Sequence, residues 1–377
     1  MDALIDRSMF IGLDTRTWFF GGAESPPPQG MREALNQYVE NRANGPEGRK
    51  QNSEVENAVR QNIAALLNGQ PEQIALLSNA SEVISMLASS IPFQTGDNVV
   101  INDLEFPSGV LPWLRLKAIG VEVRVVASRN WQVTAEDLLA SVDEHTRIVV
   151  TSHVSYMSGA KIDYAKVYDQ LKQTNTLFLV DATQSIGIVP VDIHNADFIV
   201  ASSYKWLMAG HGGGILAVNP QRTAHIDPCY VGWRSVEDMF SDTRFERFDF
   251  LPDARRFESG YPSYPTLYAM QYSTNLLLSI GIDKIEKHIL DLGTEMIEKM
   301  QKIGYAPMTP MNPEERAGNI SFVCEDGEAV ADELLKQGIY LWGGDGRIRA
   351  SIHFYNNSDD VDKLVGQLTA MAKEPTA

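Results

Sequence analysis

The strongest constraint on the fold is the alternation of short apolar runs with helical patterns between residues 74 and 218. Strands are expected at residues 74–77, 99–101, 121–126, 148–150, 177–180, 198–200 and 215–218. Helical patterns, such as residues 134–141 and 164–173, separate most of these runs. The alternation predicts an α/β fold with a mostly parallel sheet that is covered by helices on both faces. Ligands of such sheets bind beyond the carboxyl ends of the strands.

The pattern changes after Gly281, where a long amphipathic helix is followed by shorter strand-like pieces. This change predicts a second, smaller α+β domain, which the N-terminal residues join. Pro26-Pro27-Pro28 indicates an extended connection near the first boundary. The predicted boundaries are 25–275 for the large domain, and 1–24 with 276–377 for the small one.

Charge and cysteine content exclude several classes of partner. With 32 basic and 49 acidic residues, the net charge of −17 repels nucleic acids and anionic membrane surfaces. No apolar run approaches the roughly 18 residues of a membrane span, and residues 1–6 lack the basic start of a signal peptide. Cys229 and Cys324 have neither disulfide nor metal-ligand spacing. We therefore expect a cytoplasmic protein that binds a small molecule and no metal.

Asp181 and Lys205 are the candidate catalytic residues. Asp181 ends the apolar run 177–180, where a carboxylate is costly unless it pairs with a cation such as a pyridinium. Lys205 follows the run 198–200, and a lysine amine there can form a Schiff base with an aldehyde. Together they predict a pyridoxal phosphate site. A capping aspartate with a solvated lysine, or a chance match in a nucleotide-binding protein, is the alternative, although 210–214 is too irregular for a phosphate loop.

Further candidates lie at other strand ends. Ala80 and Ser81 begin a helix, and a helix N-terminus binds phosphate, although any capped helix looks the same. Phe106 could stack on a flat ring or belong to the core. Ser202 and Tyr204 flank Lys205 with hydroxyl groups that suit phosphate oxygens.

In this order, these residues resemble the class V aminotransferase family of fold-type I pyridoxal phosphate enzymes. The family includes cysteine desulfurases, kynureninase and isopenicillin-N-epimerase-like proteins, and the resemblance covers most of the chain. It implies that Ala80, Ser81, Ser202 and Tyr204 hold the phosphate, Phe106 stacks on the ring, Asp181 pairs with the pyridine nitrogen, Gln184 reaches the phenolic oxygen and Lys205 forms the Schiff base. It also implies that Arg349, in Arg349-Ala350-Ser351, binds the substrate α-carboxylate, a task that suits guanidinium geometry.

The departures from the family pattern narrow the expectation. Desulfurases carry a nucleophilic cysteine shortly before the arginine, whereas residues 340–347 contain none. Phe106 replaces their stacking histidine, and Tyr156 replaces an asparagine near the cofactor, which places Tyr156 at the substrate. We therefore expect a member of the kynureninase-like or epimerase-like branches, and not a cysteine desulfurase of the nucleophilic-cysteine type.

The resemblance also implies a homodimer, because relatives build each site from two subunits. Tyr261 replaces a threonine that reaches the neighbouring subunit's phosphate, and residues 230–234 and 261–264 are expected near the partner's cofactor.

The reaction implied starts with a small or substituted L-amino acid that displaces Lys205 to form an external aldimine. Lyase chemistry, by C–S or C–C cleavage or β-elimination, is the first prediction, and an aminotransferase or an epimerase is the alternative. A more remote alternative is a catalytically inactive binding module. No single residue selects among these reactions.

Overall fold

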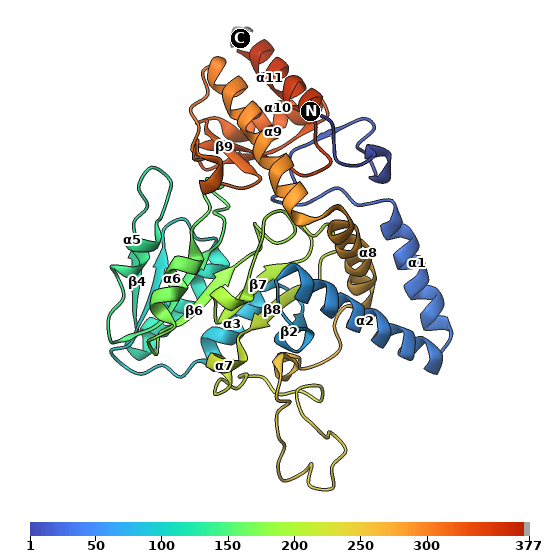
Figure 1. Cartoon of the computed structure of the whole chain (residues 1–377), viewed down its shortest axis with the longest axis vertical. Coiled ribbons are helices and arrows are strands. Elements are labelled where there is room, and N and C mark those ends of the chain that lie inside the picture. The colour runs from blue at the N-terminus through green and yellow to red at the C-terminus, as the bar shows by residue number, and fades with distance from the viewer. Residues whose placement is uncertain (373–377) are drawn as a thin grey trace.

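The protein, here a computed structural model that describes residues 1–372, alternates strands and helices along most of its length (Figure 1). The strands are β1 (Thr17–Trp18), β2 (Ile74–Leu77), β3 (Asn98–Asn102), β4 (Glu122–Val126), β5 (Thr146–Ser152), β6 (Leu177–Asp181), β7 (Phe198–Ser202), β8 (Gly214–Val218), β9 (Asn319–Val323), β10 (Ile339–Tyr340), β11 (Trp342–Gly344) and β12 (Arg347–Ser351). The α-helices are α1 (Gly30–Ala43), α2 (Pro46–Leu66), α3 (Ala80–Ser90), α4 (Leu111–Leu114), α5 (Ala135–Leu139), α6 (Tyr164–Leu171), α7 (Pro220–Thr223), α8 (Tyr264–Ile280), α9 (Ile282–Lys302), α10 (Gly327–Lys336) and α11 (Ser358–Met371).

A seven-stranded sheet in the order β2-β8-β7-β6-β5-β3-β4 forms the large layer. The strands from β4 to β7 in this order pair in parallel, whereas β8 pairs antiparallel with both β7 and β2. On β6, Phe178 and Val180 join one buried apolar cluster, and Leu177 and Leu179 join another. Because both faces are covered, the central strands are mostly apolar on both faces. The predicted mixed, mostly parallel sheet flanked by helices is confirmed.

A smaller unit contains the antiparallel sheet β11-β12-β9, with α10 packed against β11 and β12 and with α11 packed against α9. The N-terminal segment lies beside these C-terminal helices (Figure 1), because β1 pairs with β10 and Arg7 Nη1 lies 2.9 Å from Asp360 Oδ2. The domain boundaries at 24/25 and 275/276 stay a prediction. Within residues 1–372, no helix is long and apolar enough to span a membrane.

Two glycines bring backbone segments together near the end of the large sheet. A Cβ at Gly214 would lie 2.5 Å from the backbone nitrogen of Asn79, so the start of α3 can lie directly against β8. A Cβ at Gly159, where φ is +75°, would lie 1.9 Å from the carbonyl oxygen of Asn319. The loop after β5 therefore touches β9, and the two sheets meet at this end.

A buried ion-pair network ties α2 to the segment that precedes α8. Glu258 is 2 % exposed and accepts hydrogen bonds from Arg60 Nη1 at 2.8 Å, from the Leu76 backbone nitrogen at 2.9 Å and from Arg234 Nη2 at 3.0 Å. Glu56 pairs with both Arg60 and Arg234. The buried guanidinium of Arg60 and the partly buried one of Arg234 thus face two buried carboxylates, and neither sign is in excess.

We predict that Glu258→Ala lowers the free energy of unfolding by about 3–5 kcal/mol, because Arg60 and Arg234 are left to share the single carboxylate of Glu56 and one cation of the network loses its compensating charge. The matched control is Asp291→Ala, which breaks the exposed pair with Lys287 and should cost less than about 1 kcal/mol. Urea unfolding of both variants measures the difference. Equal losses in the two variants would contradict the structural role of the network.

Candidate active site

The candidate site lies where β5, β6 and β7 end together. Ser152 and Asp181 are register partners at the ends of β5 and β6, and Ser202 ends β7. A cavity at this edge is lined by Ala80, Ser81, Phe106, Ser108, Ser152, Tyr156, Asp181, Thr183, Gln184, Ser202, Tyr204 and Lys205. The structure therefore brings together the residues predicted from the sequence, with the exception of Arg349 and Tyr261.

Lys205 is the amine of this cavity. Burial, and then the positive charge of Arg349, lower the pKa of Lys205 to about 8, although the charge of Asp181 acts in the opposite direction. At neutral pH roughly a tenth of such lysines are uncharged, far more than for a lysine of ordinary pKa. Lys205 is thus prepared to act as a nucleophile and as a base.

Asp181 lies near the amine, and a second buried carboxyl group, that of Glu105, lies near Asp181. Asp181 accepts a hydrogen bond from the Thr183 backbone nitrogen at 2.8 Å, and burial raises the pKa of Asp181. Glu105, which was not among the residues predicted from the sequence, accepts hydrogen bonds from Ser152 and Asn102, each at 2.7 Å. Burial, and to a lesser degree the charge of Asp181, raise the pKa of Glu105 to about 7. Its place beside Phe106 at the end of a strand was the available signal.

The start of α3 forms one wall of the cavity. The Ala80 backbone nitrogen donates to Ser202 Oγ at 3.2 Å, and the Ser202 backbone nitrogen donates to Thr183 Oγ1 at 3.2 Å. Ser81 is exposed at the same helix end. These contacts place hydroxyl groups at a helix N-terminus, which attracts anions.

Aromatic rings surround the amine. The centroids of the Phe106 and Tyr156 rings are 5.2 Å apart, with the ring planes at 89°. Lys205 Nζ lies 5.4 Å from the Phe106 centroid and 5.9 Å from the Tyr204 centroid. Phe106 is 44 % exposed, so its face is available to a planar ligand, and the reading of Phe106 as a core residue is wrong.

Gln184 borders the cavity, but its amide is largely engaged elsewhere. Its Nε2 donates to the Gly22 carbonyl oxygen at 2.9 Å, and its Oε1 accepts from Trp206 Nε1 at 2.8 Å and from Asn319 Nδ2 at 3.0 Å. Gln184 therefore joins the N-terminal segment and β9 to the site. Its contact with a phenolic oxygen stays a prediction.

Arg349 reaches the site from the small sheet. Its Nη1 donates to the Tyr156 carbonyl oxygen at 2.7 Å, while its Nε has no hydrogen-bond partner among residues 1–372. Burial, and then the neighbouring charge of Arg347, lower the pKa of Arg349 to about 9. A substrate carboxylate would satisfy the free nitrogen.

Tyr261 lies outside this cavity within one subunit. It borders an adjacent cleft together with Ser81, is 53 % exposed, and accepts from Arg49 Nη2 at 2.8 Å. Its contact with a partner's phosphate stays a prediction.

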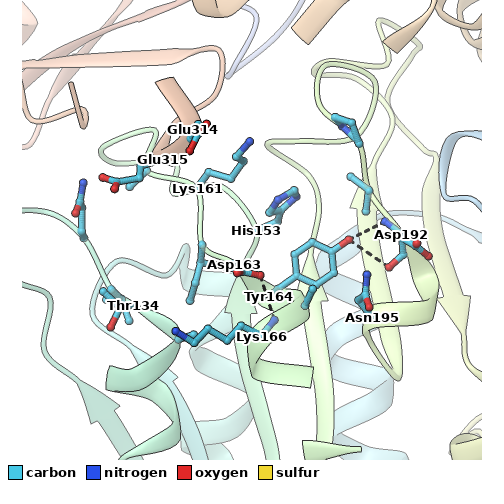
Figure 2. A pocket seen from close by; sticks show the side chains of 18 of the residues that line it. Thr134, His153, Lys161, Asp163, Tyr164, Lys166, Asp192, Asn195, Glu314 and Glu315 are labelled. Atoms are coloured by element: carbon cyan, nitrogen blue, oxygen red, sulfur yellow. Dashed lines mark hydrogen bonds between the residues drawn. The ribbon is translucent and has the colours of Figure 1, made fainter. Parts of the chain in front are cut away.

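A larger cavity, of about 840 Å³, lies apart from the Lys205 cavity and is lined in part by residues 132–136 and 160–166 (Figure 2). His153, Lys161, Tyr164 and Glu315 are among its lining residues, and burial lowers the pKa of His153 to about 3. Figure 2 shows His153 beside Tyr164, whose hydroxyl contacts the backbone of Asp192. Because no residue of the Lys205 cavity lines it, volume alone does not identify the catalytic site.

Comparisons with known proteins agree on one family. The family model described as Aminotransferase class-V matches residues 17–364. A probable cysteine desulfurase from Methanothermobacter thermautotrophicus is 29 % identical over 96 % of each chain. An uncharacterized aminotransferase from Schizosaccharomyces pombe is 26 % identical over 93 % of this chain and 90 % of the relative.

Two solved structures share the fold. The apo cysteine desulfurase from Thermococcus onnurineus has a TM-score of 0.89 and 23 % identity, with 97 % of each chain covered. The complex of the cystine C–S lyase C-DES with its reaction product cysteine persulfide has a TM-score of 0.88 and 23 % identity, with 96 % of this chain and 99 % of C-DES covered.

The expectation, drawn from the sequence, that this chain is not a cysteine desulfurase is wrong. It rested on the absence of a cysteine from residues 340–347, whereas relatives that carry this name match nearly the whole chain. A loop residue can differ between relatives while the sheet and the cofactor site are retained, because loops vary more than the elements they connect. A single missing loop residue is therefore too little to separate this chain from them.

The residues of the cavity fit pyridoxal phosphate. A second C-DES structure, a variant with glycine covalently linked to this cofactor, has a TM-score of 0.89 to the present chain. In the present chain Lys205 offers an amine, Asp181 a buried carboxyl group and the start of α3 a helix N-terminus of the kind that attracts phosphate. The buried Asp181, whose pKa is raised, suits a protonated ring nitrogen, because a cation there would hold it ionised.

We predict that the rate at which cofactor-free protein reacts with pyridoxal phosphate rises with pH through a midpoint near 8, because only the neutral Lys205 amine attacks. Arg349→Gln should move the midpoint to higher pH, because it removes a repelling charge, and Arg349→Lys should largely keep it. Exposed Arg115→Gln is the control. Stopped-flow absorbance measures the rates, and an unchanged midpoint in Arg349→Gln would contradict the electrostatic cause.

Proposed function

Because the chain belongs to the class V aminotransferase family of pyridoxal phosphate-dependent enzymes, we propose that it is a lyase that cleaves the carbon–sulfur bond of a sulfur-substituted L-amino acid. The observation that carries the proposal is the placement of the Lys205 amine beside Asp181 and Arg349. The names of the similar proteins, cysteine desulfurase and cystine C–S lyase, support the choice of bond.

The residues of the chain divide the work. Bound pyridoxal phosphate supplies an aldehyde that links to the substrate amine and a ring that withdraws electrons from Cα. Arg349 orients the α-carboxylate through its free Nε, and its charge keeps the nearby Lys205 amine partly neutral. Neutral Lys205 then removes the Cα proton, and the sulfur substituent leaves from Cβ.

The apolar walls contribute by limiting access of water. The rings of Phe106 and Tyr156 meet edge to face beside the amine, and water that is excluded there cannot screen the interactions of Asp181 and Lys205 with ligand charges. The charged groups that act at Cα therefore interact with the substrate more strongly than they would in bulk water.

We predict that the cofactor-loaded protein releases sulfide with pyruvate and ammonia from L-cysteine, and cysteine persulfide with pyruvate and ammonia from L-cystine. Lys205→Ala should lower this rate by about a thousandfold or more, because it removes the proton-transferring group. Lys336→Ala, on an exposed ion pair, is the control. Sulfide and keto-acid assays give the products. Transfer of the amino group to an added keto acid without sulfur release would favour an aminotransferase instead.

We also propose a homodimer. The segment between α7 and α8 projects from the body of the protein (Figure 1) and carries exposed aromatic side chains. Among them, Phe240 is 78 % and Phe245 is 86 % exposed. Apolar surface concentrated in this way is typical of an interface. The segment includes Tyr230 and Trp233, in the region expected near the partner's cofactor, and both are exposed.

We predict that the double substitution Phe240→Ser with Phe245→Ser shifts the protein toward monomer, because it removes apolar surface that a partner would bury. Leu111→Ser, at a site that is 61 % exposed on α4, should leave the dimer intact. Sedimentation velocity distinguishes the species. A wild-type monomer that retains its cofactor would refute the dimer.

A further inference from the structure

Arg347 is a buried cation with few hydrogen-bond partners. Its side chain is 0 % exposed, and within residues 1–372 its Nε and Nη2 have no hydrogen-bond partner. The nearest acceptor is Asp345 Oδ2, 3.4 Å from Nη1, on an exposed turn. The buried Arg60, by contrast, binds Glu56 and Glu258 at 2.9 and 2.8 Å. A buried charge with so few partners is costly, so Arg347 needs an explanation.

Arg347 lies next to the carboxylate-binding arginine. Arg347 and Arg349 are two residues apart on β12, so their side chains leave the same face of the sheet, roughly 7 Å apart along the strand. Both guanidinium groups face the Trp342 ring, with ζ carbons 4.3 and 5.5 Å from its centroid. This arrangement concentrates positive charge at one place beside the site.

Tyr156 connects Arg347 to the cavity of Lys205. The ζ carbon of Arg347 lies 5.5 Å from the centroid of the Tyr156 ring, and Tyr156 lines the cavity. The Tyr156 carbonyl oxygen also receives the hydrogen bond from Arg349. Tyr156 thus contacts both arginines, and a ligand group that extended from Arg349 past Tyr156 would approach Arg347.

We propose that Arg347 binds a second carboxylate at the end of the substrate side chain, so that the substrate is a dicarboxylic L-amino acid. This inference rests on the proposed function, because it assumes that Arg349 holds the α-carboxylate. The two guanidinium groups then each receive one carboxylate, and Arg347 exchanges a weak contact with Asp345 for a closer, charge-assisted pair. For a lyase that cleaves a C–S bond, such a substrate is a thioether or disulfide amino acid with a distal carboxylate.

A purely structural role for Arg347 explains less. Stacking on Trp342 needs only one face of the guanidinium, and a methionine of similar length would fill the space without an unpaired charge. The adjacent charges of Arg347 and Arg349 also repel each other, so nothing within this pair stabilises the second cation. An anionic substrate group removes both costs.

The test compares ligands that differ only in charge. In the first experiment, L-glutamate and L-glutamine are each titrated into the cofactor-loaded protein, and binding is followed by the visible spectrum of the cofactor. In the second, kcat/KM is measured for S-carboxymethyl-L-cysteine and for S-carbamoylmethyl-L-cysteine. We expect the wild type to prefer each carboxylate by about tenfold or more. Arg347→Gln should reduce both ratios to about one and leave the amides nearly unchanged, and Arg347→Lys should retain part of the preference.

Asp345→Asn is the matched control, because it removes the internal competitor of the substrate anion. It should retain or increase the preference for the carboxylate. Ratios near one in the wild type, with neutral thioethers still turned over, would overturn this inference alone. Equal weakening of both members of a pair by Arg347→Gln would show a structural role and overturn it too. If no amino acid changes the spectrum or is turned over, the proposed function also falls.

Discussion

The parallel pairing of β5, β6 and β7 is the constraint on which the site depends. Because these strands run in one direction, Ser152, Asp181 and Ser202 reach the same edge of the sheet although they lie far apart in sequence. Both faces of the sheet are buried in apolar clusters, so this edge is held rigidly. A small set of polar side chains can therefore be placed accurately on a largely apolar scaffold.

Opposed charges set the chemistry at that edge. Burial lowers the pKa of Lys205 and raises those of Asp181 and Glu105, so all three groups are shifted toward their neutral forms. Arg349 adds a positive charge that disfavours protonated Lys205 further. The small sheet thus contributes to the reactivity of a lysine on the large sheet, and the contact between Gly159 and Asn319 maintains this coupling.

The sequence predicted the strands, the mixed sheet and most of the cavity because each depends on local pattern. Apolar runs that end in Asp181 or Ser202 are visible without coordinates. Contacts between distant segments were not predictable. Glu105 and Arg347 are notable because their charged groups are buried, and burial of a single residue cannot be read from the sequence. The hydrogen bonds of Gln184 to Gly22 and Asn319 join segments whose contact no sequence spacing reveals. The expectation that the chain is not a desulfurase failed for a related reason. It relied on one missing cysteine in residues 340–347, whereas the similarity to desulfurases extends over nearly the whole chain.

The arginines of β12 connect the fold to selectivity. A strand places every second residue on one face, so a single substitution two positions before Arg349 is enough to add a second cation beside the first. Because Arg347 is fully buried against Trp342, its position is fixed before a ligand arrives, and little side-chain entropy remains to be lost on binding. The unpaired charge of Arg347 therefore destabilises the free protein, and only an anionic ligand removes this destabilisation. A neutral ligand of the same shape leaves it in place, and this difference is what would discriminate between them.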